Sequence, residues 1–190
     1  MTTAKKTPRG PADPKRRDRI IAAVLDVMTT EGLIGTSHRA VARAAGVPLG
    51  STTYYFDSLE DLLAGALEKL TDDYAEALRA WAGPLAGHDR RRLALAMTDL
   101  VVDYLSDDSG RIRVEYQLYL AAMDRPRLRP LAAQYTATTV DVLSTLVPHS
   151  TAVALSAVLD GFLIRGLVSP VPLDRAELED AFAAICTHHD

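Results

Sequence analysis

The fold is decided by one stretch of the sequence, TSHRAVARAAGVPLGSTTYYF at residues 36–56. Its first two residues, Thr36-Ser37, are typical helix N-caps and predict a short helix that ends before Gly46. A second short helix is predicted over 47–56. Ala42 lies four residues before Gly46, so a small side chain lets the two helices cross closely and a glycine permits a positive φ in the turn. The stretch therefore predicts a helix-turn-helix, whose second helix suits a DNA major groove roughly 12 Å wide.

Helical periodicity continues on both sides of this stretch. Before it, apolar residues on one face and a stop at Gly32 predict a first helix over 15–31. After it, Ser58-Leu59-Glu60-Asp61 resembles a capping box, in which a hydroxyl caps the helix and an acid follows three residues later. Apolar residues then recur at helical spacing as far as Trp81, so a long fourth helix is predicted over 58–82.

The remaining sequence repeats the helical pattern and contains no strand signal. Five further helices are predicted, with apolar faces within 93–105, 112–123, 131–146, 150–169 and 178–185. The fold class predicted from the sequence is therefore all-α, with about nine helices. We expect an N-terminal three-helix domain that contains the helix-turn-helix, followed by a larger C-terminal helical domain.

Composition and charge divide the chain into three parts. Residues 1–14 are rich in Pro, Lys, Thr and Gly and are expected to form a disordered basic arm. A DNA-binding domain is expected at 15–57, and a helical domain for ligand sensing and dimerisation at 58–190. Residues 1–55 carry a net charge of +5 and residues 56–190 a net charge of −9, within a total of −4. This asymmetry favours a basic DNA-facing module on an acidic body, and a basic tail that only solubilises the chain is the alternative.

The sequence argues against an enzyme and against a membrane-spanning or secreted protein. Its five His residues form no metal-spaced cluster with Cys, Asp or Glu, and no nucleophile elbow or phosphate loop is present, so no cofactor or metal is expected. The N-terminus has no signal-peptide core, and no apolar run reaches the roughly 18 uncharged residues of a membrane span. The single Cys186 excludes an internal disulfide and fits a cytoplasmic protein. An enzyme and a purely structural helical adaptor are the alternatives to a DNA-binding regulator.

Residues 15–63 resemble the N-terminal domain of the tetracycline-repressor (TetR) family of transcriptional regulators. The matching residues are Thr36, Arg39, Ala42, Ala45-Gly46-Val47, Gly50-Ser51, Tyr55-Phe56, Ser58 and Leu62. The chain departs from the family pattern at Leu49, where Lys or another polar residue is common, at Thr53, where Tyr is usual, and at Leu59, where Lys is usual. The changes at Thr53 and Leu59 remove phosphate contacts, so contact with the DNA backbone is expected to differ from the family pattern.

The resemblance implies which residues meet DNA. His38 falls where family members read a base, and a solvated surface histidine is the alternative. Leu49 or Thr52 is expected to touch a thymine methyl group, whereas Tyr55 and Phe56 are expected to pack the recognition helix on its neighbours. The implied DNA-binding residues are Thr36, Ser37, His38, Arg39, Pro48, Leu49, Gly50, Ser51, Thr52, Thr53, Tyr54, Arg16 and Arg17. Lys15 and the arm residues Lys5, Lys6 and Arg9 are further backbone contacts or parts of a solvated tail.

The resemblance also implies a regulator that binds a palindromic operator as a homodimer and is released by a small, largely apolar ligand. Repression is the commoner behaviour of the family, and activation is the alternative. The residues support a dimer because the helix at 150–169 is apolar nearly all round and therefore needs a partner surface. With the final helix it is expected to form a four-helix interface within 150–187. Asp160 and Arg165 either pair across this interface or point outward.

The ligand is expected among the fourth to eighth helices, where tyrosines add hydroxyls to otherwise apolar faces. The expected ligand-binding residues are Met97, Val101, Tyr104, Arg113, Tyr116, Gln117, Leu120, Met123, Tyr135 and Phe162. A filled core without a cavity is the alternative, and Arg113 and Gln117 are as readily surface residues. Because the helix at 58–82 joins this region to the DNA module, its tilt is expected to set the spacing of the two recognition helices, which must match one DNA turn of about 34–36 Å.

Overall fold

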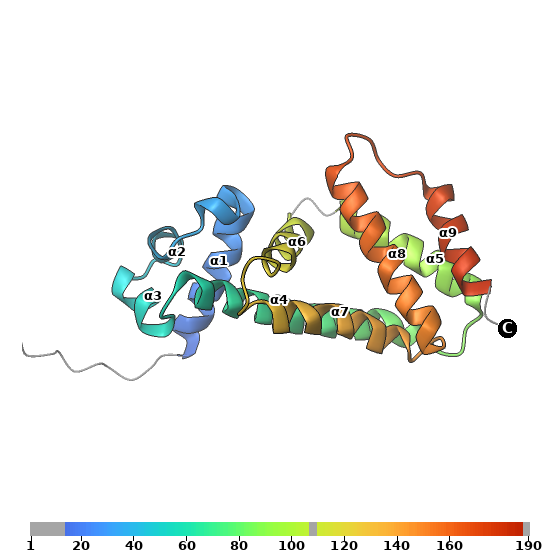
Figure 1. The fold of residues 1–190 in the computed structure, drawn as a ribbon, viewed down its shortest axis with the longest axis horizontal. Helices are drawn as coiled ribbons and strands as arrows, with labels where there is room; N and C mark the ends of the chain where they lie inside the picture. Colours follow the sequence, from blue (N-terminus) through green and yellow to red (C-terminus); the bar gives the residue numbers. More distant parts are fainter. Residues whose placement is uncertain (1–13, 107–109, 188–190) are drawn as a thin grey trace, which may run out of the picture.

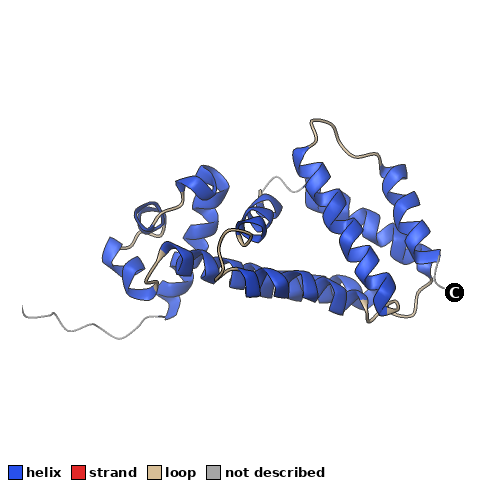
Figure 2. Cartoon of the chain, viewed as in Figure 1, coloured by secondary structure: helices blue, strands red, loops and turns tan. Residues whose placement is uncertain are grey.

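The structure, a computed structural model, describes residues 14–106 and 110–187, and every regular element in these ranges is helical (Figure 2). The described residues form nine α-helices, which confirms the predicted all-α class. They are α1 (Pro14–Gly35), α2 (His38–Ala44), α3 (Leu49–Tyr55), α4 (Leu59–Ala82), α5 (Arg90–Ser106), α6 (Arg111–Ala121), α7 (Arg129–Leu143), α8 (His149–Val168) and α9 (Arg175–Thr187), with a 3-10 turn at Gly83–Leu85. The predicted basic arm lies outside the described residues except for Pro14, which begins α1.

The helices build an elongated molecule with a group of helices at each end (Figure 1). α1, α2 and α3 gather at one end, and α5, α8 and α9 pack together at the other. α4 and α7 lie side by side between the ends. α6 lies between the two groups and packs against α1 and α4. The long helix α4 therefore connects the helix-turn-helix to the C-terminal helices, as its length predicted.

Two main apolar cores lie near the two ends. The first joins α1, α2 and α4, and it also includes Val114 and Leu118 of α6 and Leu128 before α7. The second joins α5, α8 and α9 and includes Tyr116 of α6 and Leu143 of α7. α6 therefore contributes to both cores.

Helix ends follow the stop and cap signals of the sequence. α1 is interrupted at Gly32, whose φ of 70° and ψ of 179° leave the helical region, so the predicted stop is confirmed. At the start of α4, Ser58 Oγ accepts a hydrogen bond from Asp61 N–H at 3.1 Å and donates to Asp61 Oδ2 at 2.8 Å. The predicted cap is thus formed, and α4 begins next to the recognition helix.

Candidate nucleic-acid interface and effector site

The turn between α2 and α3 has the geometry that the sequence predicts. Ser37 caps α2, since its Oγ accepts a hydrogen bond from Ala40 N–H at 3.2 Å. Val47 N–H donates to Ala42 O at 3.0 Å and closes the turn. Gly46 has a φ of 62°, and a Cβ added there would meet no atom within 4 Å. Backbone conformation rather than lack of space therefore selects glycine at this position.

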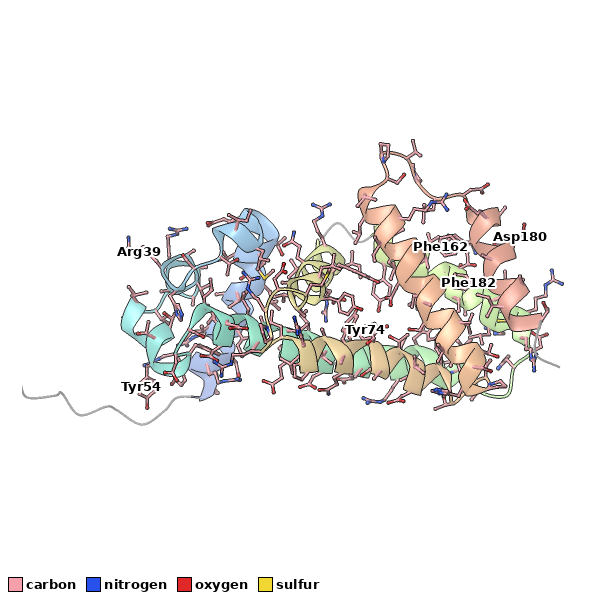
Figure 3. All side chains as sticks on the ribbon, viewed as in Figure 1. Arg39, Tyr54, Tyr74, Phe162, Asp180 and Phe182 are labelled. Atoms are coloured by element: carbon pink, nitrogen blue, oxygen red, sulfur yellow. The ribbon has the colours of Figure 1, made fainter. Side chains whose placement is uncertain are left out.

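Most of the predicted DNA contacts share the exposed surface of α2 and α3. Arg39 on α2 and Tyr54 on α3 both project outward from the same end of the molecule (Figure 3). Their neighbours on this surface, exposed or half-buried, are Ser37, His38, Pro48, Leu49, Gly50, Ser51 and Thr53. Arg16, at the start of α1, is also exposed. Exposed hydroxyls, a guanidinium and a flat phenol at one end of the molecule can meet both phosphates and base edges.

Two threonines of the predicted DNA-binding set are buried in the structure. Thr52 is 0% exposed, and its hydroxyl donates to Leu49 O at 2.8 Å. Thr36 is 3% exposed, and its hydroxyl donates to Gly32 O at 2.9 Å. A buried side chain offers no surface to a base or a phosphate, so both residues stabilise the helix-turn-helix instead. Leu49 is 45% exposed, and its contact with a thymine methyl group stays a prediction.

Two aromatic residues and one arginine hold the recognition helix on its scaffold. Phe56 is buried in the N-terminal core, and Tyr55 is half-buried against it, which confirms their predicted packing role. The guanidinium of Arg17 lies 5.5 Å from the ring centroid of Phe56. Arg17 also lies 3.7 Å from the carboxylate of Glu68 in α4. Arg17 therefore already has intramolecular partners, unlike a side chain that is free to reach DNA.

A second constellation, which we call the tyrosine–carboxylate cluster, lies where α4, α5, α6, α7 and α8 face one another. Its members are Tyr74, Tyr104, Glu115, Tyr116, Tyr119, Tyr135 and Asp160. The rings of Tyr74 and Tyr135 stack at 4.5 Å between centroids. Tyr119 lies 6.1 Å from Tyr135 and 6.2 Å from Tyr116, and Figure 3 shows Tyr74 pointing from α4 toward the interior. Flat aromatic faces from several helices therefore converge on one region.

Three tyrosine hydroxyls of the cluster are paired with buried or half-buried polar groups. Tyr74 shares a hydrogen bond of 2.8 Å with Thr139 of α7. Tyr135 donates to Glu115 Oε2 at 3.2 Å. Tyr116 donates to Asp160 Oδ1 at 2.7 Å, and this bond joins α6 to α8. The cluster is thus a hydrogen-bonded network rather than a purely apolar cavity wall.

Burial sets the electrostatics of the cluster. It raises the pKa of Glu115, against the opposing effect of Arg111, whose Nε donates to Glu115 Oε1 at 2.9 Å. Burial also raises the pKa of Asp160, against the opposing effect of the Tyr116 hydroxyl. Burial raises the pKa of Tyr104 to about 12. The tyrosines are therefore neutral hydrogen-bonding groups at neutral pH, and the carboxyl groups prefer the uncharged form more than they do in water.

The structure brings together only part of the predicted ligand-binding set. Tyr104, Tyr116 and Tyr135 belong to the cluster. Met97 and Val101 are 0% exposed and pack in the C-terminal core. These two side chains therefore fit the alternative of a filled core without a cavity.

Four of the predicted ligand contacts lie outside the tyrosine–carboxylate cluster, and their role in ligand binding stays a prediction. Leu120 and Met123 are 45% and 70% exposed, and they border a groove of about 310 Å³ between α6 and α7. Arg113 is exposed on the outside of α6. Phe162 lies against Phe182 of α9, at 5.7 Å between ring centroids, and so faces α9 instead of the cluster (Figure 3). Helical spacing alone did not reveal which side of α6 and α8 faces inward.

The remaining predicted contact, Gln117, is half-buried, and its buried Oε1 has no hydrogen-bond partner among the described residues. The predicted ligand-binding set lacks four members of the cluster, Tyr74, Tyr119, Glu115 and Asp160. One signal was available: an acid inside an otherwise apolar helical face, as at Glu115 and Asp160, indicates a buried polar partner.

Comparison with known proteins gives a consistent result. The model of the tetracyclin repressor-like C-terminal domain matches residues 88–187. The transcriptional regulator BetI 2 of Chromohalobacter salexigens is 25% identical over 178 residues, which cover 90% of this chain and 86% of that protein.

Two solved structures share the fold over nearly their whole length. The multidrug binding protein EbrR in complex with imidazole has a TM-score of 0.81 at 37% identity and covers 91% of this chain and 96% of its own. The regulator SCO7518 of Streptomyces coelicolor A3(2) has a TM-score of 0.81 at 36% identity, and the match covers 92% of this chain and 99% of SCO7518. EbrR has also been solved with ethidium, proflavin and malachite green.

Proposed function

Because this chain belongs to the tetracycline-repressor family of helix-turn-helix transcriptional regulators, we propose that it is a repressor that binds a palindromic operator as a homodimer and is released by a small, largely apolar molecule. The chain is a DNA-binding regulator and not an enzyme. The observation that carries the proposal is the pairing of an exposed α2–α3 surface with an interior tyrosine–carboxylate cluster, joined by α4 and α6. A repressor of this kind acts in the cytoplasm, where its operator lies.

The homodimer is supported by an apolar strip along α8. Its exposed members recur every three or four residues, so they lie on one helical face: Val153, Ala157, Gly161, Ile164 and Val168. Val168 is 77% exposed, which is unusual for a side chain of this kind unless a partner covers it. α8 is also long and apolar enough, by length and composition alone, to cross a membrane. A subunit interface accounts for that composition, because α8 packs against α5, α7 and α9 on its other side.

The polar residues of α8 make their contacts within the chain. Arg165 donates to both carboxylate oxygens of Glu177 in α9, at 2.6 and 2.9 Å. Asp160 accepts from Tyr116. Both residues therefore make their side-chain hydrogen bonds within the subunit. Phe162 packs on Phe182, so a charge at Phe162 tests the fold of the subunit, and Ile164 is the better position for testing the dimer.

A small aromatic effector is supported by the cluster and by the relative that binds such molecules. The rings of Tyr74, Tyr119 and Tyr135 offer flat surfaces, and the paired hydroxyls supply the few polar contacts that fix a ligand's orientation. EbrR, which is about a third identical to this chain, binds imidazole, ethidium, proflavin and malachite green. We propose that the effector of this chain belongs to the same class of aromatic molecules.

Coupling between the two sites follows from the helices that they share. α4 carries Tyr74 and begins next to the recognition helix, whereas α6 carries Tyr116 and Tyr119 and packs against α1. A ligand that spreads the cluster moves both helices. The ligand releases DNA only if it binds the non-DNA conformation better, since equal affinity for both conformations shifts nothing.

Footprinting on the DNA that flanks the protein's own gene tests this function. We expect two symmetric half-sites, about one helical turn apart. Ethidium is expected to weaken operator affinity by about 5- to 150-fold, the usual range of allosteric coupling. Protection of a single half-site by a monomer contradicts the dimer, and ethidium binding that leaves operator affinity unchanged contradicts the release mechanism.

A further inference from the structure

The two carboxylates of the tyrosine–carboxylate cluster differ in their partners. Glu115 is 4% exposed, accepts from Tyr135, and has a counter-ion in Arg111. Asp160 is half-buried and accepts one hydrogen bond, from the hydroxyl of Tyr116 at 2.7 Å. The charge of Glu115 is thus balanced inside the protein, and the charge of Asp160 is not.

No cation of the described residues lies within ion-pair distance of Asp160. The groups that interact with its charge are the hydroxyls of Tyr116, Tyr74 and Tyr119, which are neutral at neutral pH. Arg165, one and a half turns further along α8, is held by Glu177 on the α9 side. A carboxylate that is partly removed from water without a counter-ion destabilises a protein, so its retention here calls for a function.

Resting on the proposed function, we propose that the effector carries a single positive charge and that Asp160 is its counter-ion. A half-buried carboxylate remains reachable by a ligand. The neighbouring tyrosine rings attract a cation through their electron-rich faces. Because Arg111 already balances Glu115, one positive charge neutralises the cluster, and a second would remain without a partner.

In the structure the hydroxyl of Tyr116 occupies the position at Asp160 Oδ1 that the cation would take. A bound cation at Asp160 Oδ1 displaces the hydroxyl and breaks the hydrogen bond that joins α6 to α8. α6 is not among the helices that α8 mainly packs against. α6 packs instead against α1 of the DNA-binding end. Charge recognition and release of α6 are therefore the same event.

Two probes with the same tricyclic ring system test the assignment. Proflavin is a monocation at neutral pH, and acridine is neutral there. We expect wild-type protein to prefer proflavin over acridine by about 10- to 100-fold in dissociation constant, as measured by calorimetry, because a hydrogen bond to a charged group contributes about that much. Asp160→Asn is expected to abolish the preference by weakening proflavin binding, with acridine binding unchanged. Asp103→Asn, the matched control that removes an exposed carboxylate of α5 outside the cluster, is expected to keep the preference.

Tyr116→Phe provides a second variant that retains the carboxylate. Because the competing hydroxyl is gone, proflavin is expected to bind more tightly and acridine as before. The proposal is overturned if Asp160→Asn keeps the preference, if Asp103→Asn abolishes it, or if wild-type protein binds proflavin no better than acridine. Operator binding measured on the same samples separates this from the proposed function. If wild-type protein binds its operator and is released by both probes equally, the function stands and the charge assignment fails.

Discussion

The DNA-reading end and the tyrosine–carboxylate cluster are built in opposite ways. The reading surface comes from one contiguous stretch, residues 36–56, in which caps and a glycine turn place each side chain locally. The cluster takes its seven members from five helices spread over residues 74–160. Local geometry therefore defines the first site, and only packing defines the second. Substitutions should accordingly have local effects in the first and distributed effects in the second.

The largest effect is expected where operator binding depends on a second subunit. Ile164→Glu places a charge on the proposed interface, so we expect monomers and a loss of operator affinity of about 100-fold or more, because a single half-site binds weakly. Leu95→Glu on α5 is the matched control, since Leu95 is 39% exposed and Ile164 38%. Sedimentation and a gel-shift measure both properties. A dimeric Ile164→Glu protein contradicts the placement of the interface.

The next prediction separates reading from scaffolding within α3. Tyr54→Ala is expected to weaken operator binding by about 1–3 kcal/mol without changing the melting temperature, because Tyr54 is exposed. Thr52→Ala is expected to lower the melting temperature with little change in operator affinity, because the buried hydroxyl of Thr52 donates a hydrogen bond to Leu49 O. Thermal melts and operator titrations of both variants make the comparison. Equal losses of affinity in both variants at an unchanged melting temperature show that Thr52 contacts DNA after all.

A smaller effect is expected from the turn itself. Gly46→Ala forces a side-chain-bearing residue to a φ of 62°, which costs about 1–2 kcal/mol, while the added Cβ meets no atom within 4 Å. The loss of stability is expected to fall on the α2–α3 region and not on the cluster. Hydrogen exchange of α2 and α3 amides, compared with those of α8, measures this locality. Uniform loss of protection along the chain argues against a locally defined reading surface.

The smallest effect concerns the unbalanced charge of the cluster. Because burial raises the pKa of Asp160 in the folded protein, its contribution to stability is complete below the ordinary carboxyl pKa of about 3.9 and falls as pH rises through the higher folded value. Asp160→Asn is therefore expected to stabilise the ligand-free protein at pH 7 by a few tenths to about 1 kcal/mol, and to have less effect near pH 4. Denaturant titrations at the two pH values test this, and a destabilised variant at pH 7 contradicts it.

The sequence by itself determined the class of fold and the reading surface. Helical periodicity, Gly32 and Ser58 predicted where the helices end, and the spacing of Ala42 and Gly46 predicted the turn. These features depend on interactions between residues at most a few positions apart. They can therefore be read without knowing what packs against them.

Only the tertiary structure decided which side of each helix faces inward. Tyr116 and Leu120 lie one helical turn apart in α6, yet Tyr116 is 5% exposed and Leu120 is 45% exposed. The difference follows from the packing of α6, which contacts mainly α1 and α4. Glu115 is paired with Arg111, one helical turn away in α6. Asp160, in contrast, is bonded to Tyr116, which lies 44 residues away in the sequence. No local pattern encodes such a distance. Burial and charge balance in the cluster follow from how five helices pack, and that packing is a property of the whole chain.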